Sequence, residues 1–549
     1  MADRLFGLET EYAFALLNRK GQRISQPQAT DWLLKAARRR LVHLPDLHSG
    51  GLFLANGARL YIDCGHHPEF AGPELANPWD AARYVKAGER ILEALSADLA
   101  KAHDSIGQVC FFRQNVDYSG THSTWGSHES YLHRTDPTLF RKHLVPHLVS
   151  RLIYTGAGGF DSTHPGIRFT LSPRVPHLRT EVSGESTHSR GVLHTKDESL
   201  SASGYHRLHL LCSESLFSEW ALFLRVGATA LVVAMIEAGV RPGDQLALHA
   251  PLEAMRAFAA DPSCQQAFPN GRGEPVTALA IQRRYLALAE ARADASFMPP
   301  WAGEVCRQWR RVLDLLGSGG PEAAATSLDW AIRFSILEKF LRDNGCDAQQ
   351  LQRLNEAAEA IGSAVDKEGV PQGVAGLEVL VQEEKQLDEL LPKLASRLRQ
   401  KGTSLEDFKK FRALRSRVFE LDTRFGQLGA AGLFSRLDAA GVLHHHFPGV
   451  DNFEHAVECP PAVGRANLRG ACVRRLAAES AANAYACDWA AIWDRAQSRF
   501  LDLSDPFSQQ ESWKSFSPES KPDAASLLAG EHREILETLS NLRRRFIQP

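Results

Sequence analysis

Two carboxylates separated by one residue stand near the start of the chain, in Gly7-Leu8-Glu9-Thr10-Glu11-Tyr12. Side chains along a strand alternate between its two faces, so a strand here would place Glu9 and Glu11 on the same face. Two carboxylates on one face favour a bound cation, although on an arbitrary strand such side chains more often simply face solvent. This pair alone leaves both interpretations open.

A second stretch, Asn56-Gly57-Ala58-Arg59-Leu60-Tyr61-Ile62-Asp63, has the same alternation. It predicts a strand with Arg59, Tyr61 and Asp63 on one face. More acidic and imidazole side chains follow at once: His66, His67, Glu69 and Glu74. Clustered oxygen ligands suit Mg²⁺ bound together with nucleotide phosphates and suit Zn²⁺ poorly. We therefore predict a magnesium and nucleotide site, with the two histidines as surface or supporting residues.

Two further polar stretches carry weaker signals. Asn115-Val116-Asp117 would end a strand, and Gly126-Ser127-His128-Glu129-Ser130-Tyr131 has the composition of a Gly/Ser-rich loop, which is a common hairpin connection. Later, Arg190 and His194-Thr195-Lys196-Asp197-Glu198 precede Arg207 and His209. The arginines Arg190 and Arg207 could hold a phosphate or a substrate carboxylate.

Several other chemistries find no support in the sequence. It contains no GxxxxGK[ST] phosphate loop, no HExxH helix and no GxSxG elbow. The histidines at positions 444–446 have the composition of a metal site, but adjacent residues do not face one another on a regular helix or strand. We assign this triplet a structural or incidental role.

The elements that would position these residues indicate an α+β fold. Short strand candidates without a regular βαβ rhythm favour a largely antiparallel sheet, and they lie at 6–13, 58–64, 108–117, 167–171, 177–182 and 207–212. Apolar residues at helical spacing predict helices at 29–41, 79–103, 137–153, 214–238, 277–295, 300–316 and 327–342.

The length of 549 residues exceeds what one core usually holds, so we expect appended units. Residues 347–405, rich in Gln, Glu, Lys and Leu, predict a projecting helical hairpin interrupted at 370–376. A charged helical pair is more often a solvated strut or partner surface than a catalytic element. We predict a catalytic domain over 1–346 and 406–462, an insertion over 347–405 and a small C-terminal domain over 463–549.

The composition indicates which partners and which cellular compartment to expect. The chain has 63 Lys and Arg against 65 Asp and Glu, and its formal charge of −2 favours neither nucleic acid nor an acidic membrane as a partner. Nine scattered cysteines form no CxxC pair, which is typical of reduced thiols in a cytoplasm. The N-terminus lacks the pattern of a signal peptide. We expect a soluble cytoplasmic protein.

With these residues in view, the sequence resembles the Pup ligase and Pup deamidase/depupylase family of proteasome accessory factors, which is related in fold to glutamine synthetase. The resemblance rests on motifs that occur in the family's order along nearly the whole chain: 7–12, 56–63, 67–70, 115–117, 126–129, 194–198, 205–209, 465–470 and 488–489. It implies a curved, largely antiparallel sheet cradle packed with helices, which holds ATP and Mg²⁺.

The resemblance also implies roles for single residues. Glu9, Tyr61 and Glu69 would be Mg²⁺ ligands, with Glu11 close by. Arg59 would contact a nucleotide phosphate, and Trp489 would lie against the nucleotide from the C-terminal domain. Asp63 would be the catalytic base or nucleophile. Where the ligase pattern has a small hydroxyl residue that contacts ATP, this chain has Gly72.

Two branches of the family use this site differently. A ligase would transfer the ATP γ-phosphate to the C-terminal glutamate of Pup or a Pup-like modifier, and a lysine of a protein substrate would then attack the acyl phosphate. A depupylase or deamidase would hydrolyse instead, using the same Asp63. The hydrolase branch carries a long insertion before its Asn-Gly-Ala-Arg-Leu-Tyr string, whereas residues 40–53 are a short connection here. We therefore favour a ligase.

Other interpretations stay open. One is a regulatory paralogue that binds nucleotide without turnover, although the whole acidic set argues against a pure binding module. Another is a ligase for a different carboxylate, because a fold does not determine a substrate. The family's Thr-Arg-Asp-Glu-Pro is Thr195-Lys196-Asp197-Glu198-Ser199 here, which replaces a forked guanidinium with a point charge. We recognise no family counterpart for residues 347–405.

Overall fold

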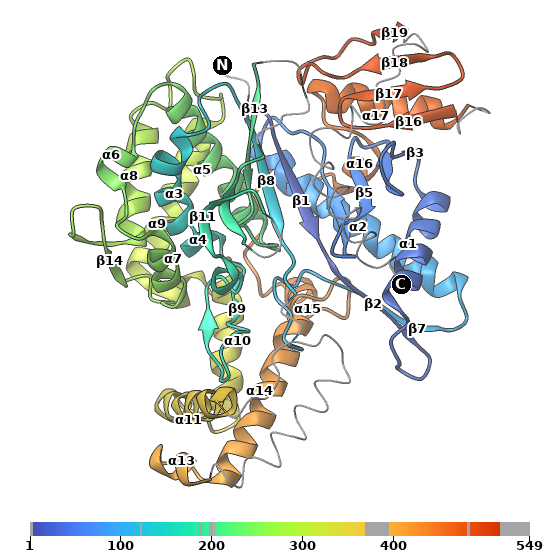
Figure 1. Ribbon diagram of the computed structural model, residues 1–549. Coiled ribbons are helices and arrows are strands. Elements are labelled where there is room, and N and C mark those ends of the chain that lie inside the picture. The colour runs from blue at the N-terminus through green and yellow to red at the C-terminus, as the bar shows by residue number, and fades with distance from the viewer. Residues whose placement is uncertain are drawn as a thin grey trace, which may run out of the picture.

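The computed structural model describes residues 4–120, 123–185, 189–196, 201, 204–367, 395–479 and 484–515. Its centre is a nine-stranded sheet in the order β11-β12-β13-β8-β1-β6-β5-β4-β3 (Figure 1). Neighbouring strands pair antiparallel except β11 and β12, which are parallel. The strands of this sheet are β1 Phe6–Glu11, β3 His43–Pro45, β4 Leu52–Leu54, β5 Arg59–Ile62, β6 Pro68–Ala71, β8 Ser127–His133, β11 Thr180–Ser183, β12 Gly191–His194 and β13 His206–Leu210.

Alternation along the strands divides the sheet into an apolar and a polar face. In β1, Phe6 and Leu8 are buried while Glu9 and Glu11 are only partly so. The two apolar residues belong to the largest core, which also contains side chains of α2, α5 and α9. The helices therefore cover one face, and the other face carries the candidate chemistry. The expected α+β class is confirmed.

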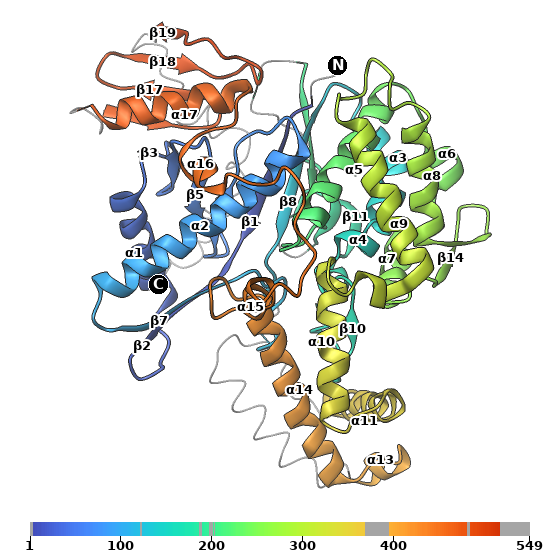
Figure 2. The same cartoon turned by 180° about the vertical axis from the view of Figure 1, so that it is seen from behind.

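Helices surround the apolar face (Figures 1 and 2). Those preceding residue 344 are α1 Gln26–Arg40, α2 Pro78–Ala102, α3 Leu139–Ser150, α4 Leu152–Thr155, α5 Glu219–Glu237, α6 Gly243–Leu246, α7 Pro251–Ala259, α8 Ala278–Glu290, α9 Ala302–Ala324 and α10 Asp329–Asp343, with a 3₁₀ turn over Val175–His177. Local chemistry sets where α2 begins. The Asn77 side chain accepts a hydrogen bond from the Asp80 N–H at 2.9 Å, and Pro78 occupies the first turn.

Nearly every residue of helix α5 is buried, and most are apolar, because the helix lies in the centre of the core. Ser218 caps it by accepting from the Ala221 N–H at 3.1 Å. By length and composition alone α5 could cross a membrane, but its most apolar window is 100% buried inside the protein. This is the behaviour of a core helix.

A separate four-stranded antiparallel sheet follows α17 (Gly464–Ala477) and consists of β16 Tyr485–Cys487, β17 Ala491–Asp494, β18 Arg499–Asp502 and β19 Trp513–Ser515. It packs through its own apolar cluster onto β3 and β4. The turn at Asn56-Gly57 forms part of this contact. Gly57 has φ 81°, and a Cβ there would lie 3.0 Å from the Ala466 carbonyl oxygen, so only glycine fits.

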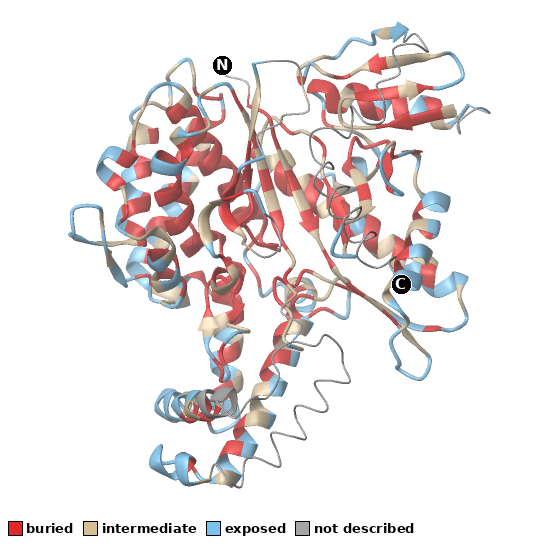
Figure 3. Ribbon diagram, in the orientation of Figure 1, coloured by how far each residue is buried: buried red, intermediate tan, exposed pale blue. Residues whose placement is uncertain are grey.

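A group of helices extends from the end of the molecule away from the C-terminal sheet (Figures 1 and 3). Here α11 (Ala348–Lys367), α13 (Ala395–Gln400) and α14 (Leu405–Phe425) share an apolar cluster with α10. The short helices α15 (Leu433–Ala439) and α16 (Phe453–Glu458) lead back to the sheet region. Two-stranded ribbons complete the fold: β2 Ala13–Asn18 with β7 Ile106–Phe112, β9 Gly159–Phe160 with β10 Phe169–Thr170, and β14 Ala267–Pro269 with β15 Pro275–Thr277.

The structure corrects several sequence predictions. The long helices all form, with shifted ends. The strand predicted over 6–13 is two strands, β1 and β2, separated at Tyr12. The predicted Gly/Ser loop at 126–131 is instead strand β8, which pairs with β1 for most of its length. Its polar residues Ser127, His128 and Ser130 had the composition of a loop, but long-range pairing decides the conformation.

The domain boundaries 346, 405 and 462 stay predictions. Helices α11 and α13 lie within the predicted hairpin, while the break predicted at 370–376 lies outside the described residues. So does the last part of the predicted C-terminal domain, 516–549.

Candidate active site

Strand register places the predicted acidic residues in one row across the polar face. Glu11 on β1 lies directly opposite Glu69 on β6, and Tyr61 on β5 lies opposite Glu69 on its other side. Directly opposed residues of neighbouring strands share a face. Glu9 and Arg59 occupy the next row, on either side of Ala71. Alternation along each strand predicted that Glu9 and Glu11 share a face and that Arg59 and Tyr61 share a face. The strand register shows that these two faces are the same face of the sheet.

The carboxylates are close enough to perturb one another. Burial, together with the negative charges of Glu9 and Glu11, raises the pKa of Glu69 well above its ordinary value. Burial beside Glu69 and Glu9 likewise raises the pKa of the Tyr61 phenol. Oxygen donors crowded in this way repel one another unless a proton or a cation lies between them. The set therefore has the chemistry of a hard-cation site.

Glu9 has a different environment from Glu69. The His128 Nδ1 on β8 lies 3.4 Å from its Oε2, and a carboxyl oxygen of Glu9 lies within 4.8 Å of nitrogens of both His128 and His209. Burial opposes ionisation of Glu9, but the hydrogen bond from His128 and nearby positive charge outweigh it and lower the pKa. Burial lowers the pKa of His209 to about 3, so this imidazole is neutral at pH 7.

Sequence reasoning did not identify His128 or His209 as candidate ligands. His128 faces Glu9 directly because β8 is the neighbour of β1, and His209 follows because β13 is the neighbour of β8. The sequence feature that could have indicated a strand here is the polar alternation of Ser-His-Glu-Ser-Tyr. The glycine and serine content of this stretch is more typical of a loop.

Asp63 comes directly after β5 and lies at the edge of the acidic row. Its Oδ1 accepts a 2.6 Å hydrogen bond from the His67 N–H, and its Oδ2 is 3.2 Å from His67 Nδ1. Oxygen and nitrogen atoms of Glu11, Asp63 and His67 lie within 4.8 Å of one another. Glu11 in turn accepts from the Gly126 N–H at 2.7 Å. His67 therefore orients the predicted catalytic carboxylate.

Arg59 is held in place by a carboxylate that the sequence did not single out. Its Nε donates to Asp46 Oδ2 at 2.7 Å, and its guanidinium lies 4.0 Å from the centre of the Tyr61 ring. Asp46 is buried and accepts from Ser49 as well, at 2.7 Å. The pair fixes the direction in which Arg59 presents its positive charge.

A cavity of about 110 Å³ lies between the main sheet and the C-terminal sheet. Its lining includes Glu9, Gly72, Arg207 and Trp489, so three predicted site residues from distant parts of the chain meet there. Trp489 packs edge-on against Phe53 with ring centres 5.1 Å apart. The Arg207 Nε is buried and has no hydrogen-bond partner among the described residues. It is available to a ligand.

A buried ion-pair network connects this cavity to α17. The Arg465 Nε donates to Glu74 Oε1 at 2.6 Å, and Arg469 pairs with Glu74 Oε2 at 2.5 Å. Arg469 also donates to the Gly57 carbonyl oxygen at 2.8 Å and lies 4.8 Å from the Trp489 ring centre. Both arginines lie in the family motif at 465–470. The sequence pattern instead placed their partner Glu74 among the predicted metal carboxylates.

Arg190 lies apart from this cavity. It precedes β12, donates a hydrogen bond to the Thr124 hydroxyl, and has Arg174 and Glu11 nearby. Burial and the positive charge of Arg174 lower its pKa. Asp197 and Glu198 of the neighbouring motif lie outside the described residues. The structure thus puts Arg190 on the Glu11 side of the acidic row and Arg207 on the Glu9 side.

A family of known proteins matches most of the sequence. The family described as Pup-ligase protein matches residues 4–360 and 393–493. The match includes the first and last parts of the predicted insertion, so only 361–392 lies outside it between the two matched ranges. The finding narrows the segment for which we recognised no family counterpart.

Two individual relatives with similar sequences are both named Pup--protein ligase. A Pup--protein ligase of Acidimicrobium ferrooxidans is 31% identical over 519 residues, which cover 93% of this chain and 97% of the relative. A Pup--protein ligase of Kribbella flavida is 34% identical over 351 residues, covering 63% of this chain and 76% of the relative.

Solved structures share the fold. A complex between the prokaryotic ubiquitin-like protein Pup and its ligase PafA has a TM-score of 0.68 at 22% identity, covering 100% of this chain and 98% of that one. A structure of PafA with ADP has a TM-score of 0.62 at 24% identity, covering 84% and 88%. With the family match over most of its length, the chain belongs to the Pup ligase family.

Proposed function

We propose that this protein is an ATP- and Mg²⁺-dependent ligase that joins the C-terminal glutamate of Pup, or of a Pup-like modifier, to lysines of protein substrates. The relatives named above are Pup--protein ligases. The observation that carries the proposal is the row of Glu11, Glu69 and Tyr61 beside a cavity lined by Glu9, Arg207 and Trp489. The nine-stranded, almost entirely antiparallel sheet supports a glutamine-synthetase-like cradle.

The residues present fit the proposed cofactors. Glu9, Glu11, Tyr61 and Glu69 would hold Mg²⁺, because they supply clustered oxygen donors. Burial and the charges of Glu9 and Glu11 raise the pKa of Glu69, and a bound cation would offset this repulsion. Arg207, whose buried Nε has no hydrogen-bond partner among the described residues, and Trp489 would contact the nucleotide from opposite sides of the cavity.

Bound Mg-ATP would supply the phosphoryl group that converts the glutamate carboxylate into an acyl phosphate. The protein's own residues would do the rest. Arg59, directed by Asp46, and Arg190 would offset phosphate and carboxylate charge. Asp63, oriented by His67, would take the proton from the attacking lysine amine at its Oδ2. Gly72, which lines the cavity, has no side chain to make the hydroxyl contact with ATP that the family pattern implies at this position.

One structural observation favours the ligase over the hydrolase. Residues 40–53, where the depupylase branch carries its long insertion, form a short antiparallel hairpin of β3 and β4 at the edge of the sheet. The C-terminal four-stranded sheet packs directly on this hairpin. We place the activity in the cytoplasm, with lysine-bearing proteins as acceptors, and propose the catalytic, insertion and C-terminal domains with the boundaries predicted above.

The test is a conjugation assay. The purified protein is incubated with Mg-ATP, a Pup-like modifier ending in glutamate and a lysine-bearing protein, and the products are followed by intact mass and by ADP release. We expect a conjugate with one ADP per bond. Cleavage of a preformed conjugate without any ligation would establish the hydrolase instead, and inactivity in both directions would refute both.

A further inference from the structure

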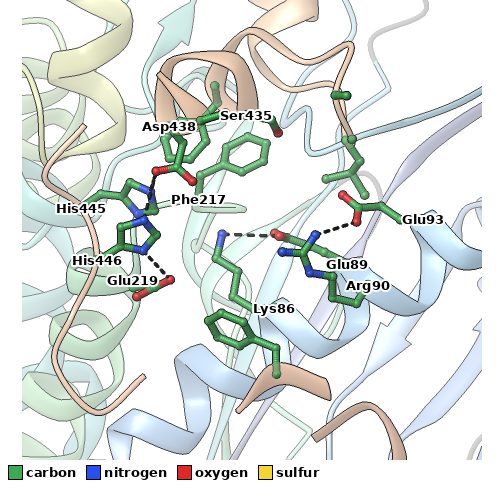
Figure 4. A pocket seen from close by; sticks show the side chains of 16 residues that line it. Lys86, Glu89, Arg90, Glu93, Phe217, Glu219, Ser435, Asp438, His445 and His446 are labelled. Atoms are coloured by element: carbon green, nitrogen blue, oxygen red, sulfur yellow. Dashed lines mark hydrogen bonds and ion pairs between the residues drawn. The ribbon is translucent and has the colours of Figure 1, made fainter. Parts of the chain in front are cut away.

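We propose that Asp438, His445 and His446 form a binding site for a divalent transition metal ion, with Zn²⁺ as the best-suited ion, and that Glu219 supports it. Asp438 lies in α15, the two histidines follow α15, and Glu219 is the first residue of α5 (Figure 4). None of the four belongs to the acidic row or lines the cavity next to Trp489. The proposal is therefore independent of the ligase assignment.

Both histidines approach the same carboxylate oxygen, and ligand atoms of Glu219, His445 and His446 lie within 4.8 Å of one another. The Nε2 atoms of His445 and His446 lie 3.1 Å and 3.0 Å from the same oxygen, Asp438 Oδ1. Zn–N and Zn–O bonds of about 2.0–2.2 Å put tetrahedral ligand atoms about 3.3–3.5 Å apart. The two nitrogen-to-oxygen separations are a few tenths of an ångström shorter, so small side-chain rotations would admit an ion between each histidine and Asp438. Imidazole with carboxylate is a donor set that suits Zn²⁺.

Adjacent histidines can converge because this segment is neither helix nor strand. Their ring centres lie 4.1 Å apart at an interplanar angle of 37°. The rule that neighbouring residues point apart applies to regular elements, and residues 443–447 contain none. The role predicted from the sequence for positions 444–446 is structural or incidental; under this proposal His445 and His446, which meet at Asp438, bind the ion, whereas His444 is exposed.

Glu219 gives His446 the support that metal-bound histidines usually have. Its Oε1 lies 3.0 Å from His446 Nδ1, while its Oε2 accepts from the Phe447 N–H at 3.0 Å. The side chain is only 2% exposed, so it holds a fixed position. A carboxylate on Nδ1 keeps the proton there and leaves Nε2 free to bind metal.

A cavity of about 340 Å³ adjoins the cluster and is lined by Lys86, Glu89, Arg90, Asp438 and both histidines (Figure 4). It provides an entry path and room for a water molecule as the fourth ligand. The basic side chains on its far side have partners of their own, because Lys86 lies 3.4 Å from Glu89 and Arg90 lies 3.0 Å from Glu93. Among the described residues, Asp438 forms ion pairs only with the two histidines.

The competing explanation is an ion-pair network in which a doubly protonated His446 bridges Asp438 and Glu219. Both arrangements satisfy the same distances, so metal content decides between them. The full chain is stripped of metal and dialysed against Zn²⁺ or Co²⁺ with Mg-ADP present to fill the nucleotide site. Bound metal is counted by mass spectrometry, and cobalt geometry is read from its visible absorption.

We expect one retained metal equivalent and the intense absorption of tetrahedral cobalt. His446→Gln should lose this equivalent, and Glu219→Gln should weaken the affinity about 10–100-fold. His444→Gln is the matched control and should bind like the unmodified protein, because His444 is exposed and outside the cluster. The Zn²⁺-dependent rise in melting temperature should follow the same pattern. No retained equivalent, or equal binding by the His444 and His446 variants, would overturn the proposal.

Discussion

At the scale of single residues, the carboxylates on the polar face lie in different surroundings. Glu69 is buried between like charges, whereas Glu9 has imidazole beside it. Asp63 stands at the edge of the row, fixed through both oxygens by His67. A carboxylate that must accept a proton from an amine benefits from this fixed orientation, because proton transfer needs hydrogen-bond geometry.

Replacing Asp63 with asparagine tests its role. The change keeps size and removes the charge that accepts the proton, so we expect conjugate formation to fall at least about 100-fold while ADP affinity changes less than about threefold. Single-turnover conjugation and calorimetric titration with Mg-ADP measure the two quantities. Asp104→Asn is the control, because the Asp104 side chain is fully exposed. Turnover that survives in Asp63→Asn would remove Asp63 from the mechanism.

At the scale of elements, the C-terminal sheet and α17 complete a site that the main sheet only begins. Trp489 reaches the cavity from the turn between β16 and β17, and α17 is attached to the main sheet through Glu74. Arg465 and Arg469 are almost fully buried, and the Glu74 carboxylate pairs with both of them. We therefore expect nucleotide binding and docking of this unit to be linked.

The contribution of Trp489 can be measured by replacing it with alanine and with phenylalanine. An aromatic contact beyond simple burial is worth about 0.5–1.5 kcal/mol, so Trp489→Ala should raise the Kd for ADP about three- to tenfold. Trp489→Phe should recover most of the affinity, because it keeps a ring against the nucleotide. Calorimetry with Mg-ADP gives the values. Equal affinities for all three proteins would place the nucleotide elsewhere.

The Glu74 network predicts a defined pH dependence. Burial opposes ionisation of Glu74, but Arg469 and Arg465 lower its pKa from 4.5 to about 2. A carboxyl with a lowered folded-state pKa stabilises the fold fully above its unfolded value and loses that contribution as the pH falls through the folded value. Glu74→Gln should therefore cost about 3 kcal/mol at pH 7, with the difference shrinking between pH 4.5 and 2.

Urea unfolding of Glu74→Gln and the unmodified protein at pH 7, 5 and 3.5 checks this expectation. Glu420→Gln in α14 serves as a control, because its ion pair with Arg424 is 2.7 Å long and solvent-exposed. A cost at pH 7 that persists unchanged at pH 3.5 would show that packing, not charge, sets the effect.

At the scale of the whole molecule, a buried charge network attaches the sheet to the helices behind it. Glu129 on β8 points away from the polar face and pairs with Arg151 at 2.7 Å, and the Arg225 Nε on α5 lies 3.6 Å from it. All three side chains are at most 3% exposed. Strand β8 thus presents His128 on the polar face, and the next residue, Glu129, attaches the strand to the core on the opposite face.

Glu129→Gln should destabilise the protein by about 3–5 kcal/mol, because it leaves two arginines buried without a counter-charge. Guanidinium unfolding monitored by circular dichroism measures the loss. Glu181→Gln is the matched control. Its pair with Arg141 has a similar length of 3.0 Å but is exposed, so its removal should cost less than about 1 kcal/mol. A similar cost for both variants would contradict the argument from burial.

The sequence by itself determined what depends on neighbours along the chain. The two-residue period of a strand puts Glu9 with Glu11, and Arg59 with Tyr61, on shared faces whatever the rest of the fold does. The apolar spacing of the long helices is equally local, and every one of them forms. The order of motifs then sufficed for the family, which the comparisons confirm.

Only the tertiary structure decided which of these local pieces meet. Strand order makes β8 the neighbour of β1 and so brings His128 to Glu9, although the Gly-Ser composition of that stretch is typical of a loop. Trp489 joins Gly72 and Arg207 because a second sheet packs on the first. His445 and His446 converge because their segment is irregular. Register, packing and irregular backbone arise from contacts between distant residues, and no short-range pattern encodes them.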